Sequence, residues 1–348
     1  MQVEEALTKL DYTQVLSDAV VEGSLTGSLI EGVLFNNVNF SRAAFAGASL
    51  IRVTFSGCNL SQQSFQNATL NNVTLHNCNL EGSDFSGLDL RSLTATACSF
   101  RSVNFSRAQI SNSLFAQCAL EKANFEYSEL KATTFSNCSL GETDFTGIKW
   151  ESFAMCEADF SLSKWEPVSI ISGVMVKCTF ANAKMSEATY VHSSFNECVF
   201  TNILCRKSSI SHCHFISAKL RNVDFFSSYM QGCIFSKAII ETSSFQSADL
   251  ASANFDESRL SEVNLSFATL TQSRCVRSVL QKVDFSGSNL RQADFSFTQV
   301  EEVIYTDAVV QYVNFHEVKG DLDLSELQAK QVYFTDEERV RIDKRLAG

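Results

Sequence analysis

The sequence has little proline and glycine, with one proline (Pro167) and 14 glycines among 348 residues. Because no stretch is rich in either, the sequence contains no low-complexity linker and predicts one continuous domain. No stretch approaches the 18 consecutive apolar residues typical of a membrane-spanning helix, so none is predicted. Residues 1–5 are acidic and precede no apolar run, which is not typical of a secretory signal peptide.

An apolar residue recurs at every fifth position from Leu25 to Phe315, which makes 59 consecutive positions without an insertion or deletion. The weakest occupants are Ala95, Cys205 and Cys275, which are small but still apolar. A period of five fits neither the 3.6 residues of a helix nor the two of a strand. It predicts a backbone that turns a similar corner every five residues and points each fifth side chain, here called the central residue, at one axis.

A second period, of twenty residues, runs through the cysteines. Seven of the twelve lie two positions before a central residue and are spaced by multiples of twenty: Cys58, Cys78, Cys98, Cys118, Cys138, Cys178 and Cys198. Twenty residues therefore make one coil of four sides, and the 24 central phenylalanines predict stacked aromatic columns inside it. Cysteines in such inward positions are predicted to be reduced and buried, as in a cytosolic protein.

A small residue, a polar residue and a central Leu or Phe form a recurring block, as in Cys58-Asn59-Leu60, Ser83-Asp84-Phe85 and Ala293-Asp294-Phe295. In this motif the chain resembles the pentapeptide-repeat family over residues 21–318. The resemblance implies an all-β solenoid, a right-handed quadrilateral β-helix of about fifteen four-sided coils with short capping helices. The central and small residues would point inward and the others toward solvent.

The two ends depart from the repeat, and a solenoid needs caps because its last coils expose unpaired edges. Residues 1–20 are predicted to form an N-terminal cap with a short helix, since apolar residues at 3, 6, 7 and 10 have helical spacing. The register stops at Gly320, so residues 319–348 are predicted to form a C-terminal cap with a helix at about 336–346. The alternative, by resemblance to family members that pair end to end, is a homodimer through the C-terminal coil.

The sequence predicts no enzyme, no cofactor and no metal site. Four carboxylates on one side (Asp84, Asp144, Asp224 and Asp284) are three or four coils apart, roughly 14–19 Å, which is too far for an acid–base pair. His192 and His212 share a column one coil apart and His214 follows closely. However, Cys213 falls in an inward position and no carboxylate completes a tetrahedral ligand set.

Charge bears on one known role of the family, because some members resemble B-form DNA in size and charge and bind type II topoisomerases such as gyrase. Such mimicry needs a continuous acidic face. The net charge of −11 divides into −3 over residues 1–60, −3 over 61–299 and −5 over 300–348. The nearly neutral repeat counts against mimicry, and acidity gathers at a candidate acidic end formed by Glu301, Glu302, Asp307 and Glu317.

Apolar residues at outward positions form a candidate protein-binding patch, because contiguous exposed apolar areas mark interfaces. Its members are Leu162, Ile171, Val174, Ile216, Phe226, Phe267 and Phe297. Phe226 and Phe267 fall on the same face two coils apart, about 10 Å at the strand spacing. The alternative is that the repeat has simply drifted in this region.

The sequence therefore predicts a cytoplasmic, non-enzymatic, rod-shaped scaffold for an unidentified protein partner, bacterial if the resemblance holds. Neither direct nucleic-acid binding nor membrane association is expected. One alternative is a DNA mimic that binds a type II topoisomerase. Another is an effector or cargo adaptor attached to a secretion system, since large pentapeptide-repeat proteins also occur in that role.

Overall fold

The computed structural model describes residues 1–322 and 332–334, so the predicted helix at about 336–346 lies outside the described residues. The chain divides into two compact units, Met1–Val174 and Met175–Gly348, and each is described by itself. The predicted division into an N-terminal cap over residues 1–20, a β-helix over residues 21–318 and a C-terminal cap over residues 319–348 stays a prediction. Among the described residues, no helix has the length and apolar character needed to cross a membrane.

Both units repeat the same five-residue side. The polar residue before the central one closes the side: Asp84 Oδ1 accepts a hydrogen bond from the Ser86 N–H at 3.0 Å, and Asn264 Oδ1 accepts one from the Ser266 N–H at 2.9 Å. The second residue after the centre then takes the left-handed conformation, with φ of 52° at Asn77. This left-handed residue turns the chain at each corner, which explains the period of five.

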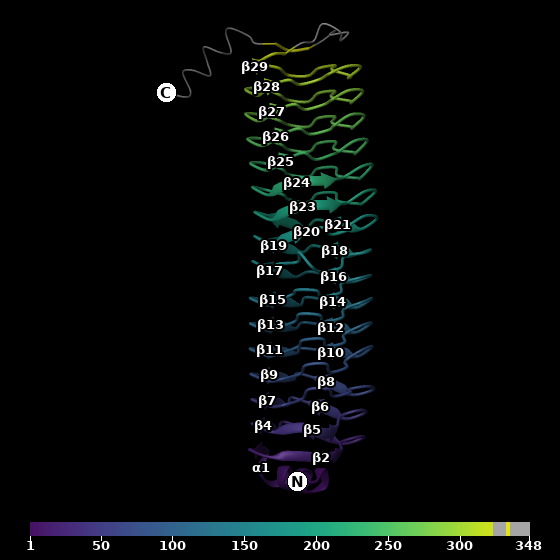
Figure 1. Ribbon diagram of the computed structural model, residues 1–348, viewed down its shortest axis with the longest axis vertical. Coiled ribbons are helices and arrows are strands. Elements are labelled where there is room, and N and C mark those ends of the chain that lie inside the picture. The colour runs from purple at the N-terminus through teal and green to yellow at the C-terminus, as the bar shows by residue number, and fades with distance from the viewer. Residues whose placement is uncertain (323–331, 335–348) are drawn as a thin grey trace, which may run out of the picture. The chain divides into compact units, whose positions relative to one another are not determined.

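In the first unit the strands form two long parallel stacks (Figure 1). One stack contains β1 (Val15–Ser17), β4 (Leu34–Asn36), β7 (Thr54–Ser56), β9 (Thr74–His76), β11 (Thr94–Thr96), β13 (Leu114–Ala116), β15 (Thr134–Ser136) and β17 (Ala154–Cys156). The other contains β3 (Leu29–Glu31), β6 (Ser49–Ile51), β8 (Thr69–Asn71), β10 (Asp89–Arg91), β12 (Gln109–Ser111), β14 (Glu129–Lys131), β16 (Lys149–Glu151) and β18 (Ser169–Ile171). β2 (Val20–Ser24) and β5 (Asn39–Ala44) pair separately.

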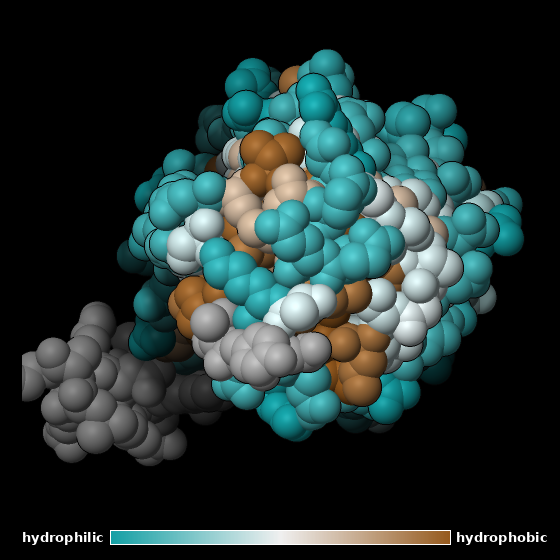
Figure 2. All heavy atoms as spheres, turned by 90° about the horizontal axis from the view of Figure 1, so that it is seen from below, coloured by the Kyte–Doolittle hydropathy of each residue, from teal (hydrophilic) through white to brown (hydrophobic). Residues whose placement is uncertain are grey.

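Helix α1 (Val3–Thr13) lies at the N-terminal end of the first unit and packs on β1 and β2. Val3, Ala6 and Leu10 are buried on one side of the helix, so they cover the end of the core. Glu4 and Glu5 occupy the first turn, where carboxylates are favourable to the helix dipole. Figure 2 shows this end of the unit, where mainly hydrophilic residues surround separate hydrophobic areas.

In the second unit the main parallel stack runs along one side of the coil (Figure 1). It contains β20 (Thr179–Ala181), β23 (Val199–Leu204), β24 (Lys219–Asp224), β25 (Ile239–Glu241), β26 (Arg259–Ser261), β27 (Val279–Gln281), β28 (Gln299–Glu301) and β29 (Lys319–Gly320). Two further strands, β21 (Thr189–Val191) and β22 (Ser194–Asn196), precede β23. β19 (Val174–Val176) contains the boundary between the units.

Strand register confirms the predicted period of twenty residues per coil. Leu50 pairs with Leu70 in the first unit, and Leu220 pairs with Ile240 in the second. The fold is an all-β parallel solenoid of about 15 turns with one short helix among the described residues. The predicted fold class is therefore confirmed.

The central residues form the core of each unit. Aromatic rings stack from coil to coil as predicted, with ring centroids 4.4 Å apart for Phe65 and Phe85 and 4.9 Å apart for Phe215 and Phe235. Small inward residues close the corners, and the Ser83 hydroxyl donates to the Leu60 carbonyl oxygen at 2.7 Å. Each unit therefore has both an apolar axis and internally bonded polar groups.

One side of the first unit breaks the small-residue rule. Phe153 occupies an inward position where other coils carry Val, Leu, Ser or Thr, and its ring stacks on Trp150 with centroids 4.1 Å apart. One coil later the same position is Gly173, where an added Cβ would lie 2.5 Å from Phe153 Cε1. The glycine thus provides the space that the large ring occupies.

Thiol reactivity provides a check on the inward positions. Of the twelve cysteines, Cys156 alone is exposed, because it follows the central Met155 on the outer side. Burial raises the pKa of the Cys205 thiol to about 12, which further suppresses its reactive thiolate. We expect one thiol to react rapidly with a chromogenic disulfide reagent in the native chain and the others only after unfolding.

The Cys156→Ser variant should lose this rapid reaction, whereas Cys118→Ser should retain it. Rapid reaction of several thiols in the native chain would contradict the burial of the cysteine column.

Thr242 is a β-branched residue in the left-handed conformation, with φ of 45°. Such a residue is strained there, whereas asparagine tolerates this conformation. We expect Thr242→Asn to raise the free energy of unfolding by about 1 kcal/mol, measured by urea unfolding followed by circular dichroism. The reverse change one coil earlier, Asn222→Thr, should lower the free energy of unfolding. An unchanged urea midpoint for Thr242→Asn would contradict the backbone strain at Thr242.

Candidate functional site

Phe267 is a large aromatic side chain at a corner of the second unit, and it is 64% exposed. Its backbone is left-handed, with φ of 58°, and its N–H donates to the Ser286 carbonyl oxygen at 2.8 Å. Its ring lies over Gly287 of the next coil, where an added Cβ would be 2.7 Å from Cδ1 and Cε1. The ring therefore rests on glycine backbone, with most of its surface in solvent.

Phe226 lies on the same side of the second unit as Phe267, two coils earlier. It is half-buried, and its N–H donates to Asp224 Oδ1 at 2.9 Å, which fixes the start of the corner. The coil between them contributes Gln246, whose Nε2 donates to Ser266 Oγ at 3.3 Å. We call Phe226, Gln246 and Phe267 the Phe267 surface.

Two other predicted patch residues of this unit lie elsewhere. Ile216 and Phe297 are on the opposite side of the coil, because ten residues correspond to two of its four sides. Phe297 is half-buried: its ring and that of His316 form a T-shaped pair with centroids 5.3 Å apart, and the Arg277 guanidinium lies 5.3 Å from its centroid. These internal contacts already cover much of its ring.

The first-unit patch residues are exposed and lie on three sides of the coil. Leu162 is 70% exposed, Val174 44% and Ile171 40%. Leu162 follows the central Phe160, and Ile171 follows the central Ile170. Val174 precedes the central Met175, so the three residues lie on three sides. Ile171 and Val174 flank one corner, whereas Leu162 lies on another side, and in the second unit Phe226 and Phe267 share a side.

The residues of the candidate acidic end are distributed around the last coils. Glu301 and Glu302 lie on the side of β28. Asp307 lies on the next side, and Glu317 lies on the side opposite Asp307. Glu301 Oε2 accepts a hydrogen bond from Gln281 Nε2 at 3.0 Å. These carboxylates therefore form no single acidic face within the second unit.

Acidic and basic residues pair between adjacent coils in both units. Lys149 Nζ lies 2.7 Å from Glu129 Oε1 in the first unit, and Arg206 Nη2 lies 2.6 Å from Asp224 Oδ2 in the second. Partial burial raises the pKa of Asp144, but hydrogen bonds from Lys164 and Thr146 outweigh this effect and lower it. Exposed pairs of this kind add little stability, but they neutralise the local charge.

The carboxylates considered for catalysis have structural hydrogen bonds. The Oδ1 atoms of Asp84, Asp144, Asp224 and Asp284 each accept from the backbone N–H two residues later, at 2.8–3.0 Å. Each thereby closes its own corner, as the motif position predicts.

The histidine and cysteine cluster forms no metal set. The rings of His192 and His212 stack with centroids 5.2 Å apart, whereas the Cys213 thiol is buried and donates to the Tyr190 carbonyl oxygen at 2.8 Å. Within residues 1–322 and 332–334, no three His, Cys, Asp or Glu side chains are placed to hold a metal ion.

Phe267 was predicted from its outward apolar character, but the glycine beneath it was not. The sequence signal for such a glycine is a spacing of twenty residues between a large side chain at one corner and a glycine at the same corner of the next coil. It recurs at Tyr127 and Gly147, where an added Cβ would lie 2.3 Å from Tyr127 Cδ1. Tyr127 is 53% exposed, so this spacing also identifies an outward aromatic ring in the first unit.

Solved structures provide one comparison. HetL, a pentapeptide-repeat protein involved in heterocyst differentiation regulation in the cyanobacterium Nostoc, shares 18% identity over 66% of this chain and 90% of its own, with a TM-score of 0.25. A trypsin-treated form of QnrB1, a plasmid-mediated fluoroquinolone resistance protein, shares 16% identity over 75% and 98%, with a TM-score of 0.35. Rfr23 from the cyanobacterium Cyanothece shares 14% over 34% and 64%, with a TM-score of 0.23.

Family models provide the second comparison. A model described as a pentapeptide repeat region matches residues 28–96 and 94–165, and one described as pentapeptide repeats (8 copies) matches residues 218–261 and 258–296. No curated protein matches the chain. The two models together cover most of its length, and the chain belongs to the pentapeptide-repeat family.

Proposed function

We propose that this chain is a non-enzymatic scaffold that binds a protein partner through the Phe267 surface. The observation that supports this proposal is the exposed Phe267 ring resting on Gly287, with Phe226 two coils away on the same side. Aromatic residues, phenylalanine among them, are enriched in protein interfaces relative to the rest of the surface. Because the corner backbone is hydrogen-bonded, a partner would meet a surface that loses little conformational freedom on binding.

The chemistry of the side chains favours binding over catalysis. The aligned carboxylates close corners, and pentapeptide-repeat proteins are typically non-enzymatic structural or binding proteins. A cytoplasmic location is part of the proposal, because the buried thiol columns suit a reducing compartment.

Ion pairing between coils weighs against a DNA mimic. The DNA-binding groove of a topoisomerase binds a continuous row of phosphate charges, so a mimic needs a continuous row of negative charges. Here Glu129 and Glu121 lie beside Lys149 and Arg101, at 2.7 and 3.3 Å, so the acidic columns are interrupted by their own counter-charges. We therefore rank a topoisomerase partner second.

The proposal is tested by capture from a bacterial lysate with the full chain as bait. The baits are the wild type, a Phe226→Ser/Phe267→Ser variant and a Phe297→Ser variant, which removes an aromatic ring from the opposite side. We expect a partner that is retained by the wild type and Phe297→Ser but lost by the double variant. Equal recovery by all three would contradict the Phe267 surface, and recovery of gyrase or topoisomerase IV by all three would favour the DNA mimic.

A further inference from the structure

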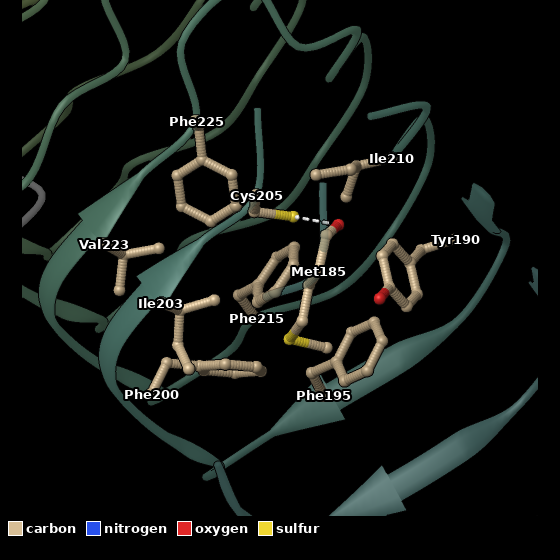
Figure 3. Close-up of a pocket in the computed structure, with 10 residues that line it drawn as sticks. All are labelled: Met185, Tyr190, Phe195, Phe200, Ile203, Cys205, Ile210, Phe215, Val223 and Phe225. Carbon is tan, nitrogen blue, oxygen red and sulfur yellow. Dashed lines mark hydrogen bonds between the residues drawn. The ribbon is translucent and has the colours of Figure 1, made fainter. Parts of the chain in front are cut away.

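The core of the second unit contains a cavity of ≈ 20 Å³ beside Cys205, whose central position most coils fill with phenylalanine or leucine (Figure 3). The Cys205 thiol donates to the Met185 carbonyl oxygen at 3.5 Å. A cavity of this size holds about one water molecule, so it is a packing void and no ligand site. Groups that recognise a partner on this side of the unit therefore lie outside the core, where the Phe267 surface is.

The Phe267 surface presents two aromatic rings at different heights along the second unit. Adjacent coils are about 4.8 Å apart, the spacing of paired strands, so Phe226 and Phe267 are about 10 Å apart along the axis. Phe267 shares its corner with small residues of the neighbouring coils, Ser227, Ser247 and Gly287, which follow one another at intervals of twenty. Its exposed ring is therefore not flanked by large side chains along this corner.

The separation of about 10 Å distinguishes two conformations of a partner segment that lies along this corner. In an α-helix, residues i and i+7 lie on one face and are about 10.5 Å apart. In an extended strand, residues that point to one face are about 6.7 or 13.4 Å apart. Only the helix places one apolar side chain on each ring, and Gln246, one coil from Phe226, would then face position i+3 or i+4.

The charges at the two ends of the corner fit the dipole of such a helix. Lys207 precedes Phe267 by three coils and Asp307 follows it by two. Both are exposed, and neither forms an ion pair within the described part of the chain. They are about 24 Å apart along the axis, the length of a helix of about 16 residues. A carboxylate is favourable at a helix N-terminus and an ammonium group at a C-terminus, so the helix would begin near Asp307 and end near Lys207.

We propose that the Phe267 surface binds an amphipathic α-helix of the partner, which lies along the axis of the second unit with apolar residues at i and i+7. The inference rests on the proposed function, because it names the class of partner for the same surface. The two rings would contact the apolar face of the helix. Ser247 and Gly287, on either side of Phe267, leave room for its larger side chains.

The test lets the surface select its own ligands. Phage that display random 18-residue peptides are depleted on the Phe226→Ser/Phe267→Ser variant, selected on the immobilised full chain and sequenced. We expect the enriched peptides to carry apolar residues seven positions apart and to bind the Phe297→Ser variant as they bind the wild type. Apolar residues at every second position would overturn the helix and keep the surface. Failure to enrich any peptide that prefers the wild type to the folded double variant would overturn the Phe267 surface itself.

The most enriched peptide, synthesised with blocked ends, then tests the conformation and the orientation by calorimetry. Proline at its central position should weaken binding at least about tenfold, because proline breaks a helix interior, and an unchanged affinity would overturn the helix. Lys207→Glu and Asp307→Lys should each weaken binding roughly two- to fivefold, whereas Lys282→Glu, on another side of the coil, should not. Tighter binding by both Lys207→Glu and Asp307→Lys would overturn the orientation.

Discussion

Replacing Gly173 by alanine is expected to destabilise the first unit by about 1–3 kcal/mol, the usual cost of overpacking a core. The added Cβ would lie 2.5 Å from Phe153 Cε1 and 3.1 Å from Ile170 Cγ2, so the Phe153 ring would have to move. Urea unfolding followed by tryptophan fluorescence measures this directly. Both tryptophans are in the first unit, and Trp150 stacks on Phe153.

Gly141→Ala is the matched control, because the nearest atom to its added Cβ is Glu121 Cγ at 3.9 Å and its φ is not positive. It should change the midpoint little. In a Phe153→Ala background, Gly173→Ala should lower the free energy of unfolding by at least about 1 kcal/mol less than it does in the wild type. The reason is that the Phe153 ring, which the added Cβ would meet, is gone. Additive effects would show that Phe153 and Gly173 do not compensate each other.

Replacing Gly320 by alanine is expected to detach β29 from β28. Gly320 has φ of 108°, which favours glycine, and an added Cβ would lie 1.9 Å from the Val300 carbonyl oxygen. We expect the local stability to fall by about 2 kcal/mol, a roughly 30-fold loss of protection from hydrogen exchange. The readout is the Lys319 amide, which donates to the Thr298 carbonyl oxygen at 2.9 Å.

Amides three coils earlier, such as that of Arg259, should keep their protection and serve as the internal control. Unchanged exchange at Lys319 would contradict the backbone contact at Gly320. The same contact explains why the apolar register stops at this position, since neither leucine nor phenylalanine fits there.

The interior could be predicted from the sequence because it depends on spacing alone. One apolar residue in five and cysteines spaced by twenty are enough to define four sides and stacked coils. The structure confirms both through the pairs Leu50–Leu70 and Leu220–Ile240. The weak occupant Cys205 was visible in the sequence, but its cavity depends on how Met185 and Tyr190 fill the neighbouring coils.

The outer surface was harder to predict, because exposure alone does not tell which residues meet. Ile216 and Phe226 are ten residues apart and so lie on opposite sides, which the period of twenty already implies. The compensation between Phe153 and Gly173, by contrast, requires the packing of two coils. The role of Gly287 beneath Phe267 likewise emerges only when adjacent corners are placed over each other.

The measurement that tests the proposed function most directly is the affinity of the captured partner for wild type, Phe267→Ser and Phe297→Ser, by calorimetry at fixed salt. We predict at least a tenfold loss of affinity for Phe267→Ser, about 1.4 kcal/mol, and less than a twofold change for Phe297→Ser. Circular dichroism should show that both variants stay folded. Equal affinities for wild type and a folded Phe267→Ser variant would contradict the proposal that this ring anchors the partner.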